Sequence, residues 1–116
     1  MGAMYVNFRI HGSHGSLELE ALADTGATFT KIPRRGAEKI GIEPRYETQV
    51  QLSTGIMAPR KVGYAEVDVE GVKRLVPVAI GEGGEPAILG YTALEILELK
   101  VNPVTRKLER TVPIEY

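Results

Sequence analysis

The sequence predicts an all-β, mainly antiparallel fold with one or two short helices. Apolar and polar residues alternate over most of the chain, which is the pattern of strands that bury one face. Turns that contain glycine separate the alternating segments, as in hairpins. Only two short helices are predicted, one delimited by Pro33 and Gly41 and one in which Ala93, Leu94 and Leu97 share a face. Together these observations favour a β fold, and the elements follow in chain order.

Two alternating runs around a glycine-rich turn predict the first hairpin. Residues 5–10 form its first strand, residues 11–15 its turn and residues 17–23 its second strand, where apolar residues alternate with glutamates. Residues 24–27 interrupt the alternation. Residues 28–32 then resume it as a short third strand.

Proline and glycine delimit the first helix and the long hairpin that follows it. Pro33 suits the first turn of a helix and Gly41 can end one, which predicts a helix over residues 34–40. Residues 47–52 and 60–69 are two strands joined around Ser53-Thr54-Gly55, so the chain forms a hairpin with a glycine at its tip.

The last third of the chain predicts three more strands and a second helix. Residues 72–80 are a strand in which Pro77 indicates an edge position or a bulge. A glycine-rich loop over residues 81–86 leads to a short apolar strand over residues 87–90. Thr92 is expected to cap a helix that runs to Leu97. Two strands over residues 98–102 and 107–114 form a closing hairpin around Pro103.

Composition sets the class of protein. The chain has 116 residues, a net charge of -1 and no cysteine. We expect a single domain over residues 1–116, with no disulfide, no thiolate metal site and no affinity for nucleic acid or an acidic membrane surface. The absence of a membrane-spanning run or a signal-peptide pattern predicts a cytoplasmic protein. Residues 1–3 are interpreted as an expression remnant before a natural start at Met4.

Asp24 is the candidate functional residue. Only two of the fifteen acidic residues are aspartates, and three of the four residues before Asp24 are apolar, so we expect its carboxylate to be partly withdrawn from water. Gly26 permits a tight turn whose N–H groups point at the carboxylate. From these residues alone, a structural Asx-turn and a functional site are equally open.

A longer motif around Asp24 helps to decide between a structural turn and a functional site. The run E-A-L-A-D-T-G-A-T, residues 20–28, resembles the active-site loop of retropepsin-like (retroviral-type, clan AA) single-domain aspartic proteases. The second half of that family's signature appears as Ile88-Leu89-Gly90 before the helix over residues 92–97, and the hairpin lies between the two motifs. The resemblance extends from about Tyr5 to Leu108. It implies a closed, barrel-like acid-protease fold in which the hairpin is a flap.

The resemblance also implies a function and a partner. Peptide hydrolysis of this type activates a water between two carboxylates, and this chain has one D-T-G, so it implies an aspartic endopeptidase that acts as a C2 homodimer. Asp24 of each subunit would be catalytic, Thr25 would bond across the dimer axis to its mate, and Gly26 would offer its backbone to the substrate. No metal or cofactor is implied.

An extended peptide would bind as an added strand. The resemblance places ten residues against it: Leu22, Ala27, Phe29, Ser53, Thr54, Gly55, Ile56, Met57, Pro86 and Ile88. Their character predicts apolar side chains on either side of the scissile bond. The competing hypothesis is a catalytically weak or inactive module of the same fold that binds peptides or dimerises. The intact D-T-G-A favours the enzyme.

Several positions depart from the retroviral pattern or stay open. Thr28 and Tyr91 stand where retroviral enzymes commonly carry a paired acid and arginine, so dimer stabilisation must come from elsewhere. A single glycine at the hairpin tip predicts either a stiffer flap or a different closed form. The alternating segment of residues 111–116 is either an ordinary edge strand or an interface strand, and both remain open.

Two groups of polar residues are given the simpler interpretation. His11 and His14, which could bind a metal or sense pH, are interpreted as exposed residues of the glycine-rich turn. Lys31, Arg34 and Arg35 are interpreted as a solvated basic cluster at the start of a helix.

Overall fold

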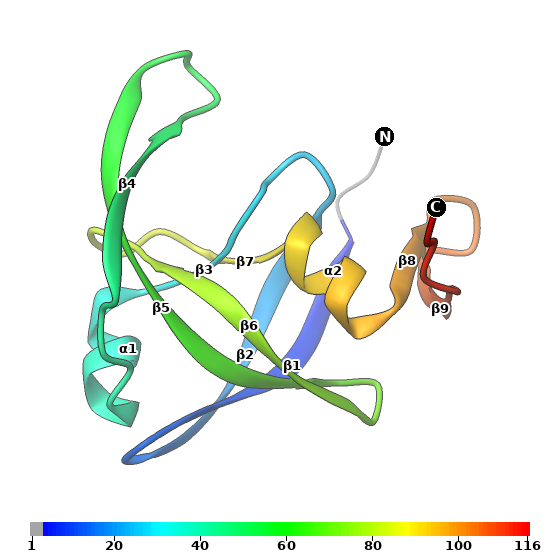
Figure 1. Ribbon diagram of the computed structural model, residues 1–116, viewed down its shortest axis with the longest axis horizontal. Helices are drawn as coiled ribbons and strands as arrows, with labels where there is room; N and C mark the ends of the chain where they lie inside the picture. The colour runs from blue at the N-terminus through cyan, green and yellow to red at the C-terminus, as the bar shows by residue number, and fades with distance from the viewer. Residues whose placement is uncertain (1–3) are drawn as a thin grey trace.

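A closed barrel of six strands forms the body of the protein in the computed structural model, which describes residues 4–116 (Figure 1). Each strand pairs with the next in the order β1, β2, β7, β3, β6, β5, and β5 pairs back to β1. The strands of the barrel are β1 (Tyr5–Gly12), β2 (Gly15–Asp24), β3 (Thr30–Ile32), β5 (Met57–Val69), β6 (Val72–Ile80) and β7 (Ala87–Gly90). The predicted all-β, barrel-like fold is confirmed.

Strand β5 holds the barrel and the hairpin together. It has 13 residues and pairs with β6 over residues 61–69, with β1 over residues 66–68 and with β4 (Tyr46–Gln51) over residues 57–62. Its N-terminal end therefore leaves the barrel with β4 as a two-stranded projection (Figure 1). Most pairings are antiparallel, as predicted; β2 with β7 and β3 with β6 are parallel.

Two short helices pack on the barrel. Helix α1 (Arg34–Ile40) follows Pro33 and ends at Gly41, whose φ of 78° only glycine adopts easily. It buries Ala37 and Ile40. Neither helix in residues 4–116 has the length and apolar character of a membrane span.

Helix α2 (Tyr91–Leu97) starts one residue before the predicted helix. Gly90 occupies the capping position, and no side chain caps the helix, so the prediction that Thr92 is the cap was wrong. The physical reason is that the chain turns directly from β7 into α2 at Gly90, which places Thr92 inside the first turn.

The barrel interior is filled by aliphatic side chains. Strands β1 and β5 largely alternate buried and exposed residues, which the sequence pattern predicted, whereas β6 does so only in part: residues 73–75 are all exposed, and Val78 and Ala79 are both buried. The largest fully buried apolar side chains are Ile10, Ile32, Ile40, Leu89, Leu94, Leu97, Val62, Val67, Val69, Val76 and Val78. Residues of α2 thus share one core with the strands that end at the candidate site.

Pro77 lies at a local edge of the sheet, one of the two positions that the sequence suggested. Strand β6 pairs with β5 through Pro77 in unbroken register, so the proline does not mark a bulge. On the other side of β6, β3 reaches only as far as Val78. The proline is tolerated because its position has a neighbouring strand on one side only.

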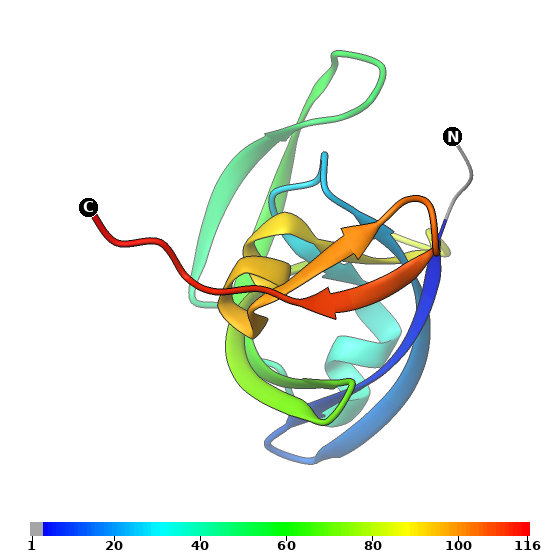
Figure 2. The same ribbon diagram turned by 90° about the vertical axis from the view of Figure 1, so that its right-hand side faces the viewer.

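The closing hairpin is shorter than predicted and shares no strand pairing with the barrel, although Leu99, Val101 and Leu108 pack against the barrel core. Strands β8 (Leu99–Asn102) and β9 (Lys107–Arg110) form a separate two-stranded sheet. The prediction of a strand to Ile114 was wrong, because beyond the bond from the Thr111 N–H to the Glu98 carbonyl (2.9 Å) no strand lies beside residues 112–116. That segment leads away from the barrel in Figure 2.

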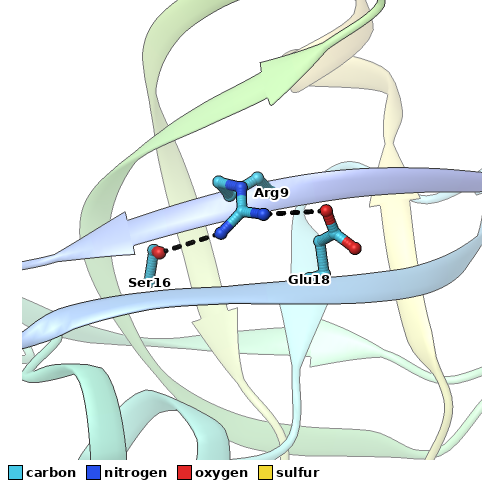
Figure 3. Close-up of polar contacts among 3 residues, drawn as sticks. All are labelled: Arg9, Ser16 and Glu18. Carbon is cyan, nitrogen blue, oxygen red and sulfur yellow. Dashed lines mark hydrogen bonds and ion pairs between the residues drawn. The ribbon is translucent and has the colours of Figure 1, made fainter.

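An ion pair on the outer face of the first hairpin links β1 and β2 (Figure 3). The Arg9 guanidinium lies 2.8 Å from the Glu18 carboxylate and donates a hydrogen bond of 3.2 Å to the Ser16 hydroxyl. Both charged side chains are largely exposed.

The interpretation of residues 1–3 as an expression remnant concerns residues outside those that the structure describes.

Candidate active site

The candidate site forms where two parallel strands end side by side. Asp24 is the last residue of β2 and pairs with Gly90, the last residue of β7. The loop of residues 25–29 that follows Asp24 passes directly over Gly90. A Cβ at Gly90 would lie 2.4 Å from the carbonyl carbon and oxygen of Phe29, so only glycine allows this approach.

Asp24 is half-buried, and one of its carboxylate oxygens is held by the loop. The Gly26 N–H donates a hydrogen bond of 2.9 Å to Asp24 Oδ1, and the Ala27 N–H donates one of 3.2 Å to the Asp24 carbonyl. This is an Asx-turn, as the residues alone suggested. Among residues 4–116 the other oxygen, Oδ2, accepts no hydrogen bond. The turn therefore fixes the carboxylate and leaves one oxygen available.

The start of helix α2 holds the Asp24 loop from behind. The Tyr91 N–H donates to the Ala27 carbonyl (2.6 Å), and the Thr92 N–H donates to the Thr28 carbonyl (3.1 Å). These amides lie in the first turn of the helix and have no partner within it. The two motifs that the sequence analysis singled out are thus bonded to each other through the backbone.

Tyr91 directs its own side chain elsewhere. Its hydroxyl donates a hydrogen bond to Glu95, one turn along α2. This bond, and the negative charge of Glu95, raise the pKa of Tyr91 above its ordinary value of 10.0. Thr28 and Tyr91 occupy the two positions at which the resemblance would place a charged pair. In this chain, backbone hydrogen bonds join the loop to the helix there.

An open cleft of about 870 Å³ lies between this loop and the β4–β5 hairpin. Both project from the same end of the barrel in Figures 1 and 2. The cleft is lined by Asp24, Gly26, Ala27, Thr28, Phe29, Lys31, Gln49, Val50, Gln51, Leu52, Ser53, Thr54, Arg60, Ala79 and Ile88.

The structure brings seven of the predicted site residues together around this cleft: Asp24, Gly26, Ala27, Phe29, Ser53, Thr54 and Ile88. Six others do not line it: Leu22, Thr25, Gly55, Ile56, Met57 and Pro86. Thr25 lies exposed beside Asp24, and within residues 4–116 its hydroxyl forms no hydrogen bond.

Three of these six residues lie at the outer end of the hairpin. Its tip closes through hydrogen bonds from the Leu52 N–H to the Ile56 carbonyl and from the Gly55 N–H to the Leu52 carbonyl, each 2.8 Å. Gly55 has a φ of 89°. Ile56 and Met57 are 65% and 56% exposed, so this end of the hairpin presents large apolar side chains without a partner in the chain.

Lys31 was misinterpreted from the sequence. Arg34 and Arg35 are exposed, as expected, but Lys31 is half-buried and lines the cleft. The signal for this lay in the alternation of β3: Thr30 and Ile32 are fully buried in the core, so the residue between them must face the other side of the sheet.

Arg60, which the sequence analysis did not single out, is the second cation in the cleft. Its side chain is 6% exposed and lies 3.6 Å from the Glu85 carboxylate. Burial raises the pKa of Glu85, whereas hydrogen bonds from the Glu82 and Gly83 backbone lower it. The charges of Lys31 and Arg60 lower this pKa further, so that it lies below the ordinary 4.5.

The histidines lie far along the first hairpin from this cleft. His14 is exposed in the turn, as predicted, but His11 is half-buried in β1, and its Nε2 has no hydrogen-bond partner among the described residues. His11 faces a second, shallower pocket with Arg45 and Tyr64. No group of three potential metal-ligating side chains occurs in residues 4–116.

Comparison with known proteins identifies one family. A family model described as aspartyl protease matches residues 6–93, from β1 into α2. The matched segment contains the Asp24 loop, the β4–β5 hairpin and the strand that ends at Gly90. No curated protein matches the chain significantly.

Proposed function

The chain belongs to the retropepsin-like aspartyl protease family, and from this membership we propose that it is an aspartic endopeptidase that works as a homodimer. One observation carries the proposal. The Asp24 carboxylate, fixed by the Gly26 N–H at 2.9 Å, lines an open cleft of about 870 Å³, which is within the size range of ligand-binding sites.

A second subunit is required by the chemistry. Hydrolysis of a peptide bond by carboxylates needs one as a general base and one protonated as a general acid. Among the described residues, Asp24 is the one aspartate or glutamate that lines the cleft, and Asp68, the other aspartate, lies on β5 beside the turn to β6. The second carboxylate is therefore the Asp24 of a partner, and the exposed Thr25 beside it is free to bond across the axis.

The proposed reaction uses both copies of Asp24. One carboxylate takes a proton from a water, whose oxygen adds to the substrate carbonyl carbon, while the other carboxyl gives its proton to the carbonyl oxygen. The resulting tetrahedral intermediate breaks its C–N bond as a proton passes to the leaving nitrogen. Two new termini are released, and no cofactor is consumed.

The hairpin is the proposed flap. A peptide that lies between the Asp24 loop and residues 49–54 would be covered by the β4–β5 projection, which would exclude water when closed. Ile56 and Met57, exposed in the single chain, would then contact the peptide or the partner's hairpin.

The experiment is peptide-library cleavage by three proteins: the wild type, Asp24→Asn and Asp68→Asn. We expect the wild type and Asp68→Asn to cut the same peptides, whereas Asp24→Asn is inactive because an amide cannot serve as the base. Asp68→Asn is the matched control, because it removes the same charge from the only other aspartate in the sequence. If neither the wild type nor Asp68→Asn cuts any peptide while both dimerise, the inactive module is the better explanation.

A linked dimer tests the second subunit. Two copies joined by a flexible linker should be active when both carry Asp24 and inactive when one carries Asn at this position, since each site needs both carboxylates. Full or half activity in the mixed dimer would show that one carboxylate suffices and would overturn the homodimeric site.

A further inference from the structure

Lys31 emerges from the floor of the cleft between apolar residues. It pairs with Ile88 of β7 on one side and with Ala79 of β6 on the other, and all three residues line the cleft. Residues opposite one another on paired strands project to the same face. The lysine is therefore held in place by apolar neighbours and is half-buried among them.

No anion of the chain neutralises Lys31 by contact. In the described part of the chain, its ammonium forms no ion pair within 4.0 Å and no hydrogen bond. A cation that is partly removed from water loses hydration, and a carboxylate partner recovers part of that loss. A lysine in this setting is poised to bind an anion from outside the chain.

Arg60 adds a second positive charge to the same cleft, and its position is fixed. One guanidinium nitrogen donates to the Pro59 carbonyl at 3.0 Å, and the other nitrogen faces Glu85 at 3.6 Å. Glu85 also accepts a hydrogen bond of 2.9 Å from the Glu82 N–H. One carboxylate thus lies beside two cations, so this end of the cleft has one positive charge in excess. Asp24, the one acidic residue that lines the cleft among those the structure describes, lies two strands away.

We propose that Lys31, supported by Arg60, forms a subsite for the carboxylate of a glutamate or aspartate side chain of the substrate. The proposal rests on the proposed peptidase function and adds an acidic residue to the apolar side chains that the site residues suggested. The Lys31 ammonium donates to this carboxylate, and Arg60 contributes its positive charge.

The topology gives the place of the acidic residue in the substrate. Strand β7 separates β3 from β2, and Lys31 is in register with Ile88 and through it with Leu22, two residues before Asp24. Lys31 therefore lies two strand spacings across the sheet and two residues along it from Asp24, which is about 12 Å. An extended peptide of about three residues, together with the length of its acidic side chain, covers that distance. The acidic side chain is therefore within about three residues of the scissile bond.

The test scans each of the three positions on either side of the scissile bond of a cleaved peptide with Glu, Gln, Leu and Lys. At one position we expect kcat/KM to be about tenfold or more higher for Glu than for the isosteric Gln, and lowest for Lys, as for a charge-assisted hydrogen bond. In Lys31→Met this Glu-to-Gln ratio should fall to about one to three.

Two further variants sharpen the result. Lys31→Glu should reverse the preference at that position from Glu to Lys, which a merely structural role of Lys31 would not produce. Lys61→Met is the matched control, because Lys61 is the exposed neighbour of Arg60 on β5 and does not line the cleft. It should keep the wild-type ratio.

Binding measurements separate failure of the subsite from failure of the proposed function. Apolar peptides that carry Glu or the matching Gln at one position, chosen without reference to cleavage, are titrated onto Asp24→Asn by calorimetry, which needs no turnover. At one position the Glu peptide should bind with a Kd about tenfold lower. If the wild type cuts nothing but this difference is found, the subsite stands and the peptidase fails. Equal kcat/KM values for Glu and Gln at all six positions, or equal or unmeasurable binding, would overturn the subsite.

Discussion

Gly90 and Thr30, sixty residues apart in the chain, are joined by a hydrogen bond of 3.1 Å from the Gly90 N–H to the Thr30 Oγ1. Thr30 is fully buried, so no water can replace its hydroxyl. The bond lies directly behind the Asp24 loop, between the strand that follows the loop and the strand that pairs with Asp24. It therefore helps to set how the loop sits on β7.

Thr30→Val should lower the free energy of unfolding by about 1 to 3 kcal/mol, because the isosteric valine leaves the buried Gly90 N–H without an acceptor. Chemical denaturation followed by circular dichroism measures this change. Thr28→Val is the control in the same segment: its side chain is exposed, and only its backbone carbonyl is used. A loss no larger than that of the control would mean that the amide finds another partner.

Gly90→Ala should destabilise the protein by about 1 to 3 kcal/mol, as overpacking does, and should also reduce peptidase activity. The new methyl group would meet the Phe29 carbonyl at 2.4 Å, and this backbone can move only by shifting the Asp24 loop. Unfolding and cleavage assays are compared with those of Gly84→Ala, where nothing lies within 4 Å of the added Cβ. Equal behaviour of the two variants would contradict the close approach.

Structural features that depend only on residues close together in the chain were predicted correctly from the sequence. Alternation located the barrel strands, and the glycine in Ser53-Thr54-Gly55 located the hairpin tip, because both depend on residues adjacent in the chain. The same holds for the Asp24 turn, in which the carboxylate and its donor Gly26 are two residues apart.

Features that depend on strand pairing could not be predicted. Lys31 was assigned to a solvated cluster. Alternation in β3 indicates that Lys31 faces away from the core, but its place in the cleft arises only when β3 inserts between β6 and β7. Arg60 was not predicted to be a site residue for the same reason, because its partner Glu85 lies on a loop that is distant in the sequence. The prediction of a strand to Ile114 was wrong because alternation indicates only that a segment can pair, and pairing also needs a partner strand.

Glu85→Gln should destabilise the protein at neutral pH and have less effect in acid. The folded pKa of Glu85 lies below its ordinary 4.5, so the carboxylate stabilises the fold above that pH, and this contribution is lost as the pH falls through the folded pKa. Urea unfolding between pH 7 and about 3 should show the two proteins converging below pH 4.5. Because Glu85 is 36% exposed, solvent screening keeps the difference small.

The control for this experiment is Glu82→Gln, which lies in the same loop and uses only its backbone N–H. It should track the wild type at every pH. A difference between wild type and Glu85→Gln that stays constant across the range would assign the effect to packing and not to charge.

Arg9→Ala should change the free energy of unfolding by less than about 1 kcal/mol, although the Arg9–Glu18 pair is only 2.8 Å long. Both side chains are solvated, so the attraction is weak and ordering them costs entropy. The double variant with Glu18→Ala measures the coupling between them. A coupling well above 1 kcal/mol would show that the outer face of the β1–β2 hairpin contributes more to stability than its exposure suggests.

Removal of residues 111–116 should weaken the proposed dimer and leave each subunit folded. Val112 and Ile114 are 81% and 78% exposed. Past the Thr111 N–H, the backbone of this segment forms no hydrogen bond with the rest of residues 4–116, so the fold loses little without it. A segment with alternating apolar residues and no partner strand among these residues is suited to pairing with a second copy.

Sedimentation velocity over a dilution series should give the truncated chain a dimer Kd about tenfold or more above that of the full chain, while circular dichroism stays the same. Val112→Ser combined with Ile114→Ser keeps the segment at full length and removes only its apolar contacts. If this variant dimerises normally while the truncation does not, the backbone of the segment contributes the binding. If both dimerise as tightly as the full chain, residues 111–116 lie outside the interface, and the contacts must come from the Asp24 loop and the exposed hairpin tip.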